Sequence, residues 1–276
     1  EISECLVGSE MCIRDSISYM HITQKEATLY IIEEKLSPEV KTYLEENEVT
    51  IKSYNKIESD IKNVRQNIQV SPTLNMKLFN AAGYPSSHGI DTGHKIMEIP
   101  SPVSLLKAVK NETEMNGFRH AMERDGIAMV KFLTWLKEAV PAGNESELSV
   151  DRKLYELRAE QANFKGISFD TIAGYKEHAA IVHYEATPET DIPLKPEGML
   201  LLDSGAQYPD GTTDITRTIV LGPLSDEEKT DYTLVLKGFL QLQNAVFPEG
   251  TCGTQLDVLA RQAMWKAGIN YFHGTG

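Results

Sequence analysis

Two aspartates in the stretch 199–222 have the residue type and the spacing needed to hold a metal ion. Asp203 ends the apolar run 199–202, and Asp214 lies inside a run rich in Thr, Ile and Val. An ionised carboxylate in apolar surroundings is unfavourable unless a cation pairs with it. Carboxylate oxygens favour Mg²⁺, Mn²⁺ or Ca²⁺ over softer metals. The two aspartates are therefore candidate metal ligands.

The turn between the two runs decides whether the aspartates face the same side. The runs are typical of paired strands joined through the Pro-Asp-Gly turn at 209–211. A two-residue loop at 208–209 would set Asp203 directly opposite Asp214, with Cβ atoms roughly 5 Å apart. A turn centred on Asp210 would send them to opposite faces unless a bulge restores the alignment. We expect the tight register or a bulge, with divalent cations between the carboxylates as in two-metal hydrolytic sites.

The same stretch resembles the metal-binding hairpin of a known peptidase family. Without that family, Asp210 and Asp214 could be ordinary turn residues and Asp203 the end of a strand. Asp-Ser-Gly-Ala-Gln-Tyr at 203–208, followed by Asp-Gly-Thr-Thr-Asp-Ile-Thr-Arg-Thr at 210–218, is similar to the aminopeptidase P branch of the pita-bread metallopeptidases. The resemblance implies that Asp203 binds one metal ion and that Asp214 bridges two. The implied ions are Mn²⁺, the usual choice of the family.

The resemblance also implies two catalytic histidines. His183 follows the apolar residues 180–182, where a histidine is more often structural than catalytic. The family carries a similar Ile-Val-His-Tyr segment, whose histidine contacts the substrate and stabilises the tetrahedral intermediate, a task that suits an imidazole donor. His273 begins His-Gly-Thr-Gly and corresponds to the substrate-pocket histidine of the family motif His-Gly-Thr-Gly-His. His178 receives no role and is expected to be a surface or loop residue.

Part of the family's metal site is not encoded in this sequence. In the family motif the second histidine is the metal ligand, and the chain stops at Gly276, directly before that position. Two downstream Glu ligands, one of them the general base, are absent as well. The chain as it stands is expected to bind metal weakly and to be essentially inactive, whereas the completed gene product is expected to be an active enzyme.

Composition narrows the class of protein. The 276 residues allow one large domain or two ordinary ones. A formal net charge of -13 argues against nucleic acid or an anionic membrane as the main partner, because both would be repelled. The sequence has no apolar run of about 18 residues, so no segment is expected to span a bilayer. Three cysteines do not make a disulfide framework, which favours a cytoplasmic protein.

The chain divides into three parts in our interpretation. Residues 1–16 lack hydrophobic periodicity, resemble read-through of sequencing-adapter DNA, and are expected to be a non-native tail. Residues 17–103 alternate strand and helix signals, and the resemblance implies part of a creatinase-like α/β domain. The proline-containing stretch 98–104 marks the boundary. Residues 104–276 are expected to form an incomplete pita-bread metallopeptidase domain.

Capping patterns and apolar runs predict an α+β architecture in this last part, which the resemblance identifies as the pita-bread fold. Four helices are expected: from the capping box at 111–114, from Ser149 to near Gly166, from Ser225 to about Val246, and from Thr254 to before Gly268. The segments between them, 167–175, 179–185 and the hairpin, are expected to be strands.

The resemblance implies a Xaa-Pro aminopeptidase, which removes the N-terminal residue from peptides with proline in second position, and a homodimer. One alternative is a related prolidase or a metal-free creatinase-type hydrolase, although retention of Asp203 and Asp214 disfavours the metal-free case. Another is a catalytically dead pita-bread protein that serves as a binding module. Mn²⁺-dependent release of the first residue from Xaa-Pro peptides would separate them.

Overall fold

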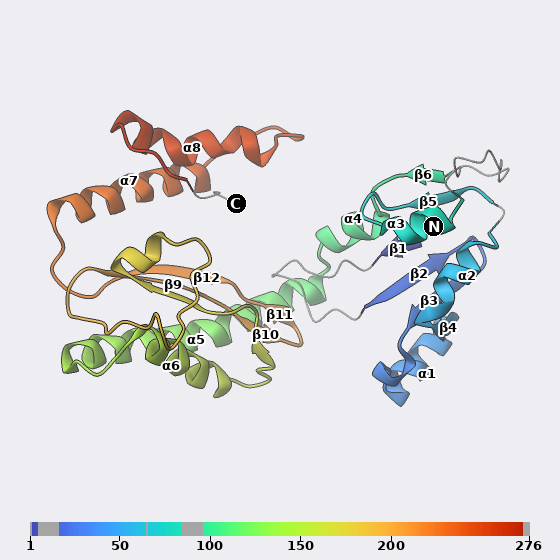
Figure 1. The fold of residues 1–276 in the computed structure, drawn as a ribbon, viewed down its shortest axis with the longest axis horizontal. Helices are drawn as coiled ribbons and strands as arrows, with labels where there is room; N and C mark the ends of the chain where they lie inside the picture. The colour runs from blue at the N-terminus through green and yellow to red at the C-terminus, as the bar shows by residue number, and fades with distance from the viewer. Residues whose placement is uncertain (1, 5–16, 65, 84–95, 273–276) are drawn as a thin grey trace. The chain divides into compact units, whose positions relative to one another are not determined.

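The computed structural model describes residues 2–4, 17–64, 66–83 and 96–272 (Figure 1). Its contacts divide the chain into two units, Glu1–Arg119 and His120–Gly276, which are described separately. Within the described ranges, none of the helices combines the length and the apolar character that crossing a membrane requires.

Unit 1 contains a six-stranded mixed sheet with the order β4-β3-β2-β1-β5-β6. Its strands are β1 (Ile2–Glu4), β2 (Ser18–Ile22), β3 (Ala27–Ile31), β4 (Val49–Ser53), β5 (Ile68–Val70) and β6 (Ile96–Glu98). β2 and β3 follow each other in the chain and form an antiparallel hairpin. β1 pairs with both β2 and β5, so the sheet includes three residues that the sequence analysis left out of the fold. Their non-native origin stays a prediction.

Short helices lie between these strands and after β6. They are α1 (Pro38–Glu46), α2 (Ile57–Ile61), α3 (Met76–Ala81) and α4 (Pro102–Ala108), with 3₁₀ turns at Glu33–Lys35 and Tyr54–Lys56. The start of α1 is fixed by local chemistry, because Ser37 accepts a hydrogen bond from the Val40 N–H at 3.3 Å and Pro38 takes the first helical position. The core of this unit gathers around Tyr30 and Val70, both almost fully buried.

Unit 2 carries two small antiparallel sheets and the long helices. The sheets have the orders β12-β9-β8 and β11-β10-β7. Their strands are β7 (Gly166–Ile167), β8 (Ile172–Tyr175), β9 (Met199–Ser204), β10 (Ala206–Tyr208), β11 (Gly211–Thr212) and β12 (Ile215–Val220). The helices are α5 (Glu112–Ala142), which begins in unit 1, α6 (Glu147–Ala159), α7 (Asp226–Gln243) and α8 (Gly253–Lys266).

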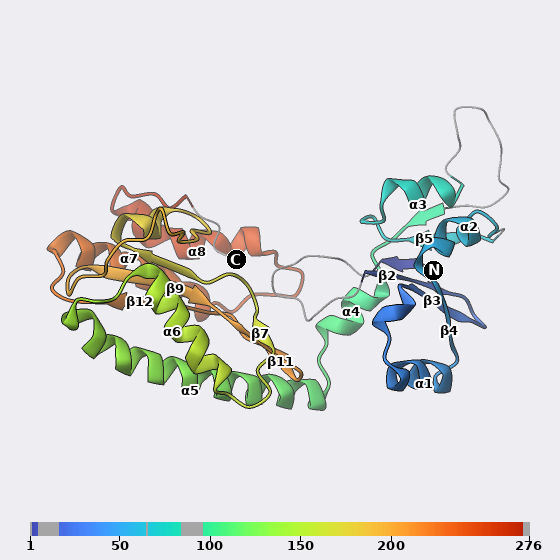
Figure 2. The same cartoon turned by 60° about the horizontal axis from the view of Figure 1, so that its bottom comes forward.

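Alternating burial on β9 gives its sheet two different faces. Leu200 and Leu202 are fully buried in the core that includes residues of α5 and α6, and Figure 2 shows these helices along one side of the sheet. Side chains alternate across a strand, so Leu201 and Asp203 point to the opposite face. Both are only partly buried. The candidate metal ligand therefore lies on the face away from α5 and α6.

Two of the predicted helix starts are confirmed by their caps. Asn111 and Glu114 exchange hydrogen bonds of 2.8 and 2.9 Å between side chain and backbone at the start of α5. Ser225 and Glu228 form the corresponding capping box at the start of α7. Each box satisfies two backbone N–H groups that the helix leaves without a partner.

The predicted start and end of α6 are wrong. The cap is Ser146, and Ser149 is the third helical residue, whose hydroxyl accepts a hydrogen bond of 2.7 Å from the Ser146 N–H. The helix ends at Ala159, well before Gly166. Ser149 has the residue type of a cap, but it completes the capping box that Ser146 begins. In α8 the cap is likewise earlier than predicted, at Cys252 with Gln255 in the third position.

The prediction of a strand at 179–185 is also wrong. This segment follows β8 as a 3₁₀ helix, Lys176–Ala180, and then a turn. Ile181 and Val182 are about half exposed, and His183 has a left-handed backbone with φ of 54°. A short apolar run is typical of a buried strand, but here the chain folds back over β8 and leaves these side chains outside the core.

Candidate metal centre

The register of the hairpin differs from the predicted one by two residues. A two-residue turn at 209–210 joins β10 and β11. The same register continues into β9 and β12, where Asp203 stands opposite Thr216. The expected placement of Asp203 directly opposite Asp214 is therefore wrong, since Asp214 comes two residues before Thr216.

The two aspartates nevertheless share a face of the ribbon. Residues two positions apart point to the same side of a strand, so the Asp214 side chain follows that of Thr216. Burial, followed by the charge of Asp203 and a side-chain hydrogen bond to it, raises the pKa of Asp214 above its ordinary value. Asp214 remains solvent-accessible, so its desolvation is partial. The two carboxyl groups therefore lie close together, although Asp214 is the diagonal neighbour of Asp203 rather than the residue directly opposite it.

One oxygen of this pair has no partner in the described part of the chain. Asp203 Oδ1 is buried and accepts no hydrogen bond there. A buried carboxylate oxygen without a partner is strongly unfavourable, and a cation removes that penalty. The pair therefore fits a divalent ion. Among the described residues, no group of three or more His, Cys, Asp or Glu side chains could hold a metal, so these two carboxylates are a partial ligand set.

A buried ion pair contacts the hairpin through Thr213, next to Asp214. Arg158 on α6 donates to Asp125 on α5 through Nε at 2.6 Å and Nη2 at 3.1 Å, and both side chains are almost fully buried. The Thr213 hydroxyl donates to Asp125 Oδ2 at 2.9 Å and accepts from the Ala206 N–H at 2.9 Å. Thr213 directly precedes Asp214. The two helices are thus linked to the backbone beside a candidate ligand.

Close backbone packing at Gly205 links the two sheets of unit 2. Gly205 lies between β9 and β10, and a Cβ atom there would overlap the Thr213 carbonyl oxygen and Ser168 Oγ. Ser168 Oγ donates to that carbonyl at 2.9 Å. The absence of a side chain at position 205 therefore lets the backbone at 205, the Ser168 side chain and the Thr213 carbonyl meet directly beside Asp214.

Replacing Gly205 with Ala is expected to displace the Thr213 carbonyl and to weaken metal binding as well as stability. Overpacking of this kind typically costs about 1–3 kcal/mol. Urea unfolding of metal-free protein measures the loss of stability, and Mn²⁺ titration measures the affinity. Gly253→Ala is the control, because a Cβ there meets no atom within 4 Å. Equal behaviour of the two variants would contradict this account of the hairpin.

The raised pKa of Asp214 predicts a measurable pH dependence in the metal-free protein. Carboxyl ¹³C NMR should give a titration midpoint for Asp214 above the ordinary value of 3.8. Because the folded state holds this proton more strongly than the unfolded state, the contribution to stability is present below pH 3.8 and is lost as the pH rises through the folded pKa. Asp203→Asn should lower the midpoint. An unchanged midpoint in that variant would show that Asp203 does not act on Asp214.

The structure places His183 and His178 differently from the predictions, and it does not describe His273. His183 lies in the exposed turn after the 3₁₀ helix rather than at the end of a strand. His273 lies outside the described residues, so the structure does not test its pairing with His183. The expectation for His178 is wrong: its Nδ1 is 3.0 Å from both carboxylate oxygens of Glu147, which is fully buried.

Sequence reasoning missed Glu147 and the pair formed by Asp125 and Arg158. A charged residue in the interior stripe of an amphipathic helix is a usable signal, and Asp125 lies one turn before the buried Met129. Glu147 carried no such signal, because acidic residues are common in the first turn of a helix. Its partners come from a segment about 30 residues later and become neighbours only through the fold.

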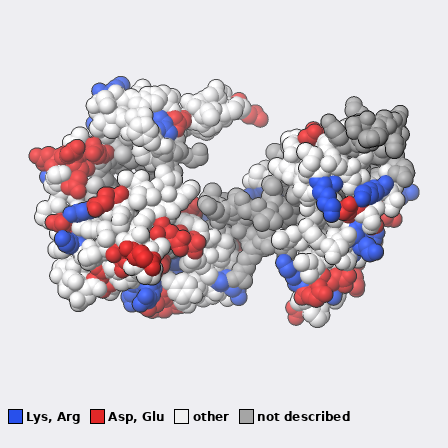
Figure 3. Space-filling view, in the orientation of Figure 1, with Lys and Arg blue, Asp and Glu red and all other residues white. Residues whose placement is uncertain are grey.

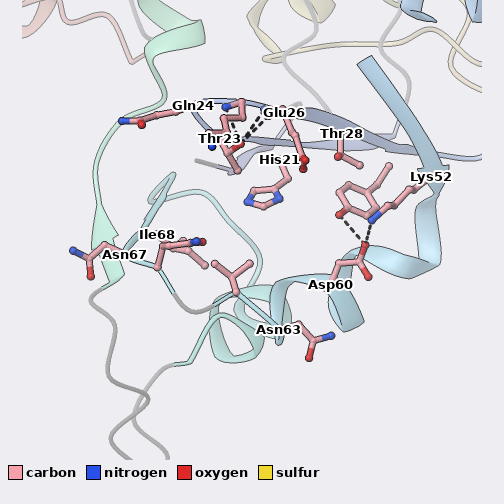
Figure 4. A pocket seen from close by; sticks show the side chains of 14 residues that line it. His21, Thr23, Gln24, Glu26, Thr28, Lys52, Asp60, Asn63, Asn67 and Ile68 are labelled. Carbon is pink, nitrogen blue, oxygen red and sulfur yellow. Dashed lines mark hydrogen bonds and ion pairs between the residues drawn. The ribbon is translucent and has the colours of Figure 1, made fainter. Parts of the chain in front are cut away.

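A cavity in unit 1 is separate from this centre. It has a volume of about 990 Å³, and Figure 4 shows His21, Lys52 and Asp60 among its polar lining. Lys52 Nζ lies 2.6 Å from Asp60 Oδ2, which also accepts a hydrogen bond of 3.0 Å from the Tyr30 hydroxyl. None of the predicted site residues lines this cavity.

The fold and the hairpin are those of a peptidase family. Residues 116–276 match metallopeptidase family M24, and residues 16–114 match the creatinase/prolidase N-terminal domain. The chain belongs to metallopeptidase family M24. The predicted pita-bread fold, with a creatinase-like domain before it, is confirmed by these matches.

Individual relatives are named as Xaa-Pro aminopeptidases. The chain is 42% identical over 268 residues to "Probable Xaa-Pro aminopeptidase P" of Paracoccidioides brasiliensis (strain Pb03), covering 94% of this chain and 43% of that protein. A protein of the same name from Botryotinia fuckeliana is 41% identical over 263 residues, with 94% and 40% covered. The chain thus spans less than half the length of these curated relatives.

Two solved structures are similar to this chain. X-prolyl aminopeptidase from Caenorhabditis elegans, described as a cytosolic enzyme with a di-nuclear active site, has a TM-score of 0.85 and 32% identity, covering 94% of this chain and 43% of its own. Xaa-Pro dipeptidase from Bacillus anthracis has a TM-score of 0.69 at 21% identity, with 93% of this chain and 69% of its own covered. The second similarity concerns the fold alone.

Proposed function

We propose that the protein acts as a metal-dependent Xaa-Pro aminopeptidase, which hydrolyses the bond after the first residue of peptides with proline in second position. The observation that carries this proposal is the pair Asp203 and Asp214, with a buried, unpartnered carboxylate oxygen on the hairpin of an M24 peptidase. The names of the relatives at 41–42% identity support the choice of substrate.

The roles of the residues follow from their chemistry. Asp203 and Asp214 would hold two divalent ions, Mn²⁺ in our proposal, through their carboxylate oxygens. Such ions, when bound, supply Lewis acidity and lower the pKa of a coordinated water. His183 and His273 would orient the substrate carbonyl and donate hydrogen bonds to the oxygen that gains charge. The apolar face of β9 supports Asp203 on a rigid strand, which keeps its carboxylate in place.

Partners and location are part of the same proposal. Peptide substrates, a cytoplasmic location and a homodimer all stay predictions. Figure 3 shows Asp and Glu side chains gathered over the displayed face of unit 2, in keeping with the formal net charge of -13. A surface of this kind repels polyanions, which supports the expectation that neither nucleic acid nor an anionic membrane is the main partner.

Peptide hydrolysis tests the proposal. A protein of the relatives' length that contains this chain is incubated with Mn²⁺ and with two tripeptides that differ only in proline or alanine at the second position. We expect release of the first residue from the proline peptide, loss of release with a chelator, and much slower release from the alanine peptide. Cleavage confined to Xaa-Pro dipeptides would instead indicate a prolidase. No cleavage, with tight binding to a protein partner, would indicate a binding module.

A further inference from the structure

Glu147 has a buried carboxylate with three donors that all come from one distant segment. It is the first residue of α6 and is fully buried. Its Oε1 accepts from the Tyr175 N–H at 2.8 Å, and its Oε2 accepts from the Tyr184 hydroxyl at 2.9 Å. His178 Nδ1 is 3.0 Å from both oxygens. Glu147 thus binds the segment 175–184 at both of its ends and at His178 within it.

The start of α6 can hold this charge. The positive end of the helix dipole favours a negative side chain in the first turn. The helix start is itself fixed, because the Glu147 N–H donates to the Ile192 carbonyl at 3.3 Å and the Leu148 N–H donates to Asp191 Oδ1 at 3.1 Å. Glu147 is therefore a rigid anchor rather than a mobile surface acid.

The segment that Glu147 holds lies on the same face of the sheet as Asp203. Gly174 on β8 pairs with Leu201, and Ile172 pairs with Asp203, so all four residues point to one face. A Cβ atom on Gly174 would lie 2.9 Å from the Ala179 Cα atom. The 3₁₀ helix Lys176–Ala180 therefore covers this face, and the turn with His183 follows directly from it.

The turn itself is held on both sides of His183. The Ile181 N–H donates to the His178 carbonyl at 3.1 Å, and the Tyr184 ring packs against the His178 ring with centroids 4.6 Å apart. His183 adopts φ of 54°, a conformation that is unfavourable for a residue with a Cβ and that persists where the surroundings fix it. His178 and Tyr184, which lie before and after His183 in the chain, both bind Glu147. These two contacts supply such a constraint.

We propose that Glu147 is a positioning residue that holds the turn 181–184 and thereby sets the place of the His183 imidazole on the Asp203 face. The positioning rests on contacts of Glu147, His178 and Tyr184 alone. Its effect on catalysis rests in addition on the role of His183 in the proposed function. Two experiments separate these parts.

The first experiment measures positioning without metal or substrate. NMR spectra of the ¹³C- and ¹⁵N-labelled chain are compared for Glu147→Gln, Tyr184→Phe and the control Glu156→Gln, an exposed residue of the same helix. Glu147→Gln should weaken the NOE between the His178 and Tyr184 rings, because both rings lose the carboxylate that they share and NOE intensity falls steeply as the rings separate. It should also shift the His183 ring signals. Tyr184→Phe removes one donor and should shift the same signals less.

Core signals decide how the result is interpreted. The methyl signals of Leu200 and Leu202 should remain in place in both variants, which shows that the sheet is intact. His183 signals that do not move in either variant would overturn the proposal. Shifts at His183 that occur only together with shifts at both leucines would also overturn it, because Glu147 would then act on general stability.

The second experiment measures kinetics with the peptidase of the relatives' length that contains this chain. Glu147→Gln should lower kcat at least about tenfold with KM and metal content little changed, because a misplaced oxyanion donor affects mainly the transition state. Glu156→Gln should behave as the unaltered enzyme. If the NMR result holds and kcat is unchanged, Glu147 positions the turn and the role proposed for His183 is wrong.

Discussion

Replacing Asp214 with Asn is expected to lower the affinity for Mn²⁺ by roughly 100-fold or more, since even loss of an outer partner of a metal ligand can reach that size. The substitution keeps the shape of the side chain but removes the negative charge of a proposed metal ligand. It also leaves Asp203 Oδ1 buried with no cation to balance the carboxylate charge. Isothermal titration of the metal-free protein with Mn²⁺ measures the effect.

The matched control for this variant lies in the same hairpin. Asp210→Asn removes an acid that pairs with Arg124 at the turn and is not a candidate ligand. It should leave the Mn²⁺ affinity almost unchanged. An equal loss in both variants would mean that the hairpin attracts Mn²⁺ through its general charge, and the assignment of Asp214 as a ligand would be wrong.

Replacing Asp125 with Asn is expected to destabilise the metal-free protein by about 3–5 kcal/mol, because it leaves the Arg158 guanidinium buried without a counter-charge. Arg158 Nη1 is buried and lacks a hydrogen-bond partner among the described residues. No other acceptor is therefore at hand to take the place of Asp125 beside the guanidinium. The Thr213 hydroxyl loses a charged acceptor as well. Urea unfolding followed by circular dichroism gives the change in the free energy of unfolding.

Two further variants test the reason for that loss. Glu160→Gln breaks the exposed ion pair with Lys131 and should change stability far less. The double variant Asp125→Leu with Arg158→Met removes both buried charges and should recover much of the loss, since apolar replacements of a buried pair are often neutral. A small effect of Asp125→Asn, or no recovery in the double variant, would contradict the role of this pair.

Local signals in the sequence predicted much of the fold. Ser37 with Pro38, Asn111 with Glu114, and Ser225 with Glu228 each mark a helix start through chemistry confined to four residues. The hairpin could be read in the same way, because an apolar strand, a turn sequence and a β-branched strand follow one another. These features depend on neighbours in sequence, which sequence reading captures.

Features that depend on the tertiary fold could not be predicted. The Pro-Asp-Gly sequence is compatible with several two- and three-residue turns, and only pairing along β9 and β12 selects the register in which Asp203 faces Thr216. The segment around His183 has the apolar character of a strand, but it follows a 3₁₀ helix as a turn, and its Tyr184 hydroxyl donates to the distant Glu147. The partners of Glu147 lie 28 to 37 residues further along the chain, and they leave no local pattern around it.

The most direct test of the whole account is anomalous diffraction at the manganese edge from crystals grown with Mn²⁺. The account predicts anomalous density against the carboxylates of Asp203 and Asp214, within the bonding distance of about 2.0–2.6 Å that oxygen-bound divalent cations show. Density confined to other sites, or carboxylates that hold no ion at saturating Mn²⁺, would contradict it.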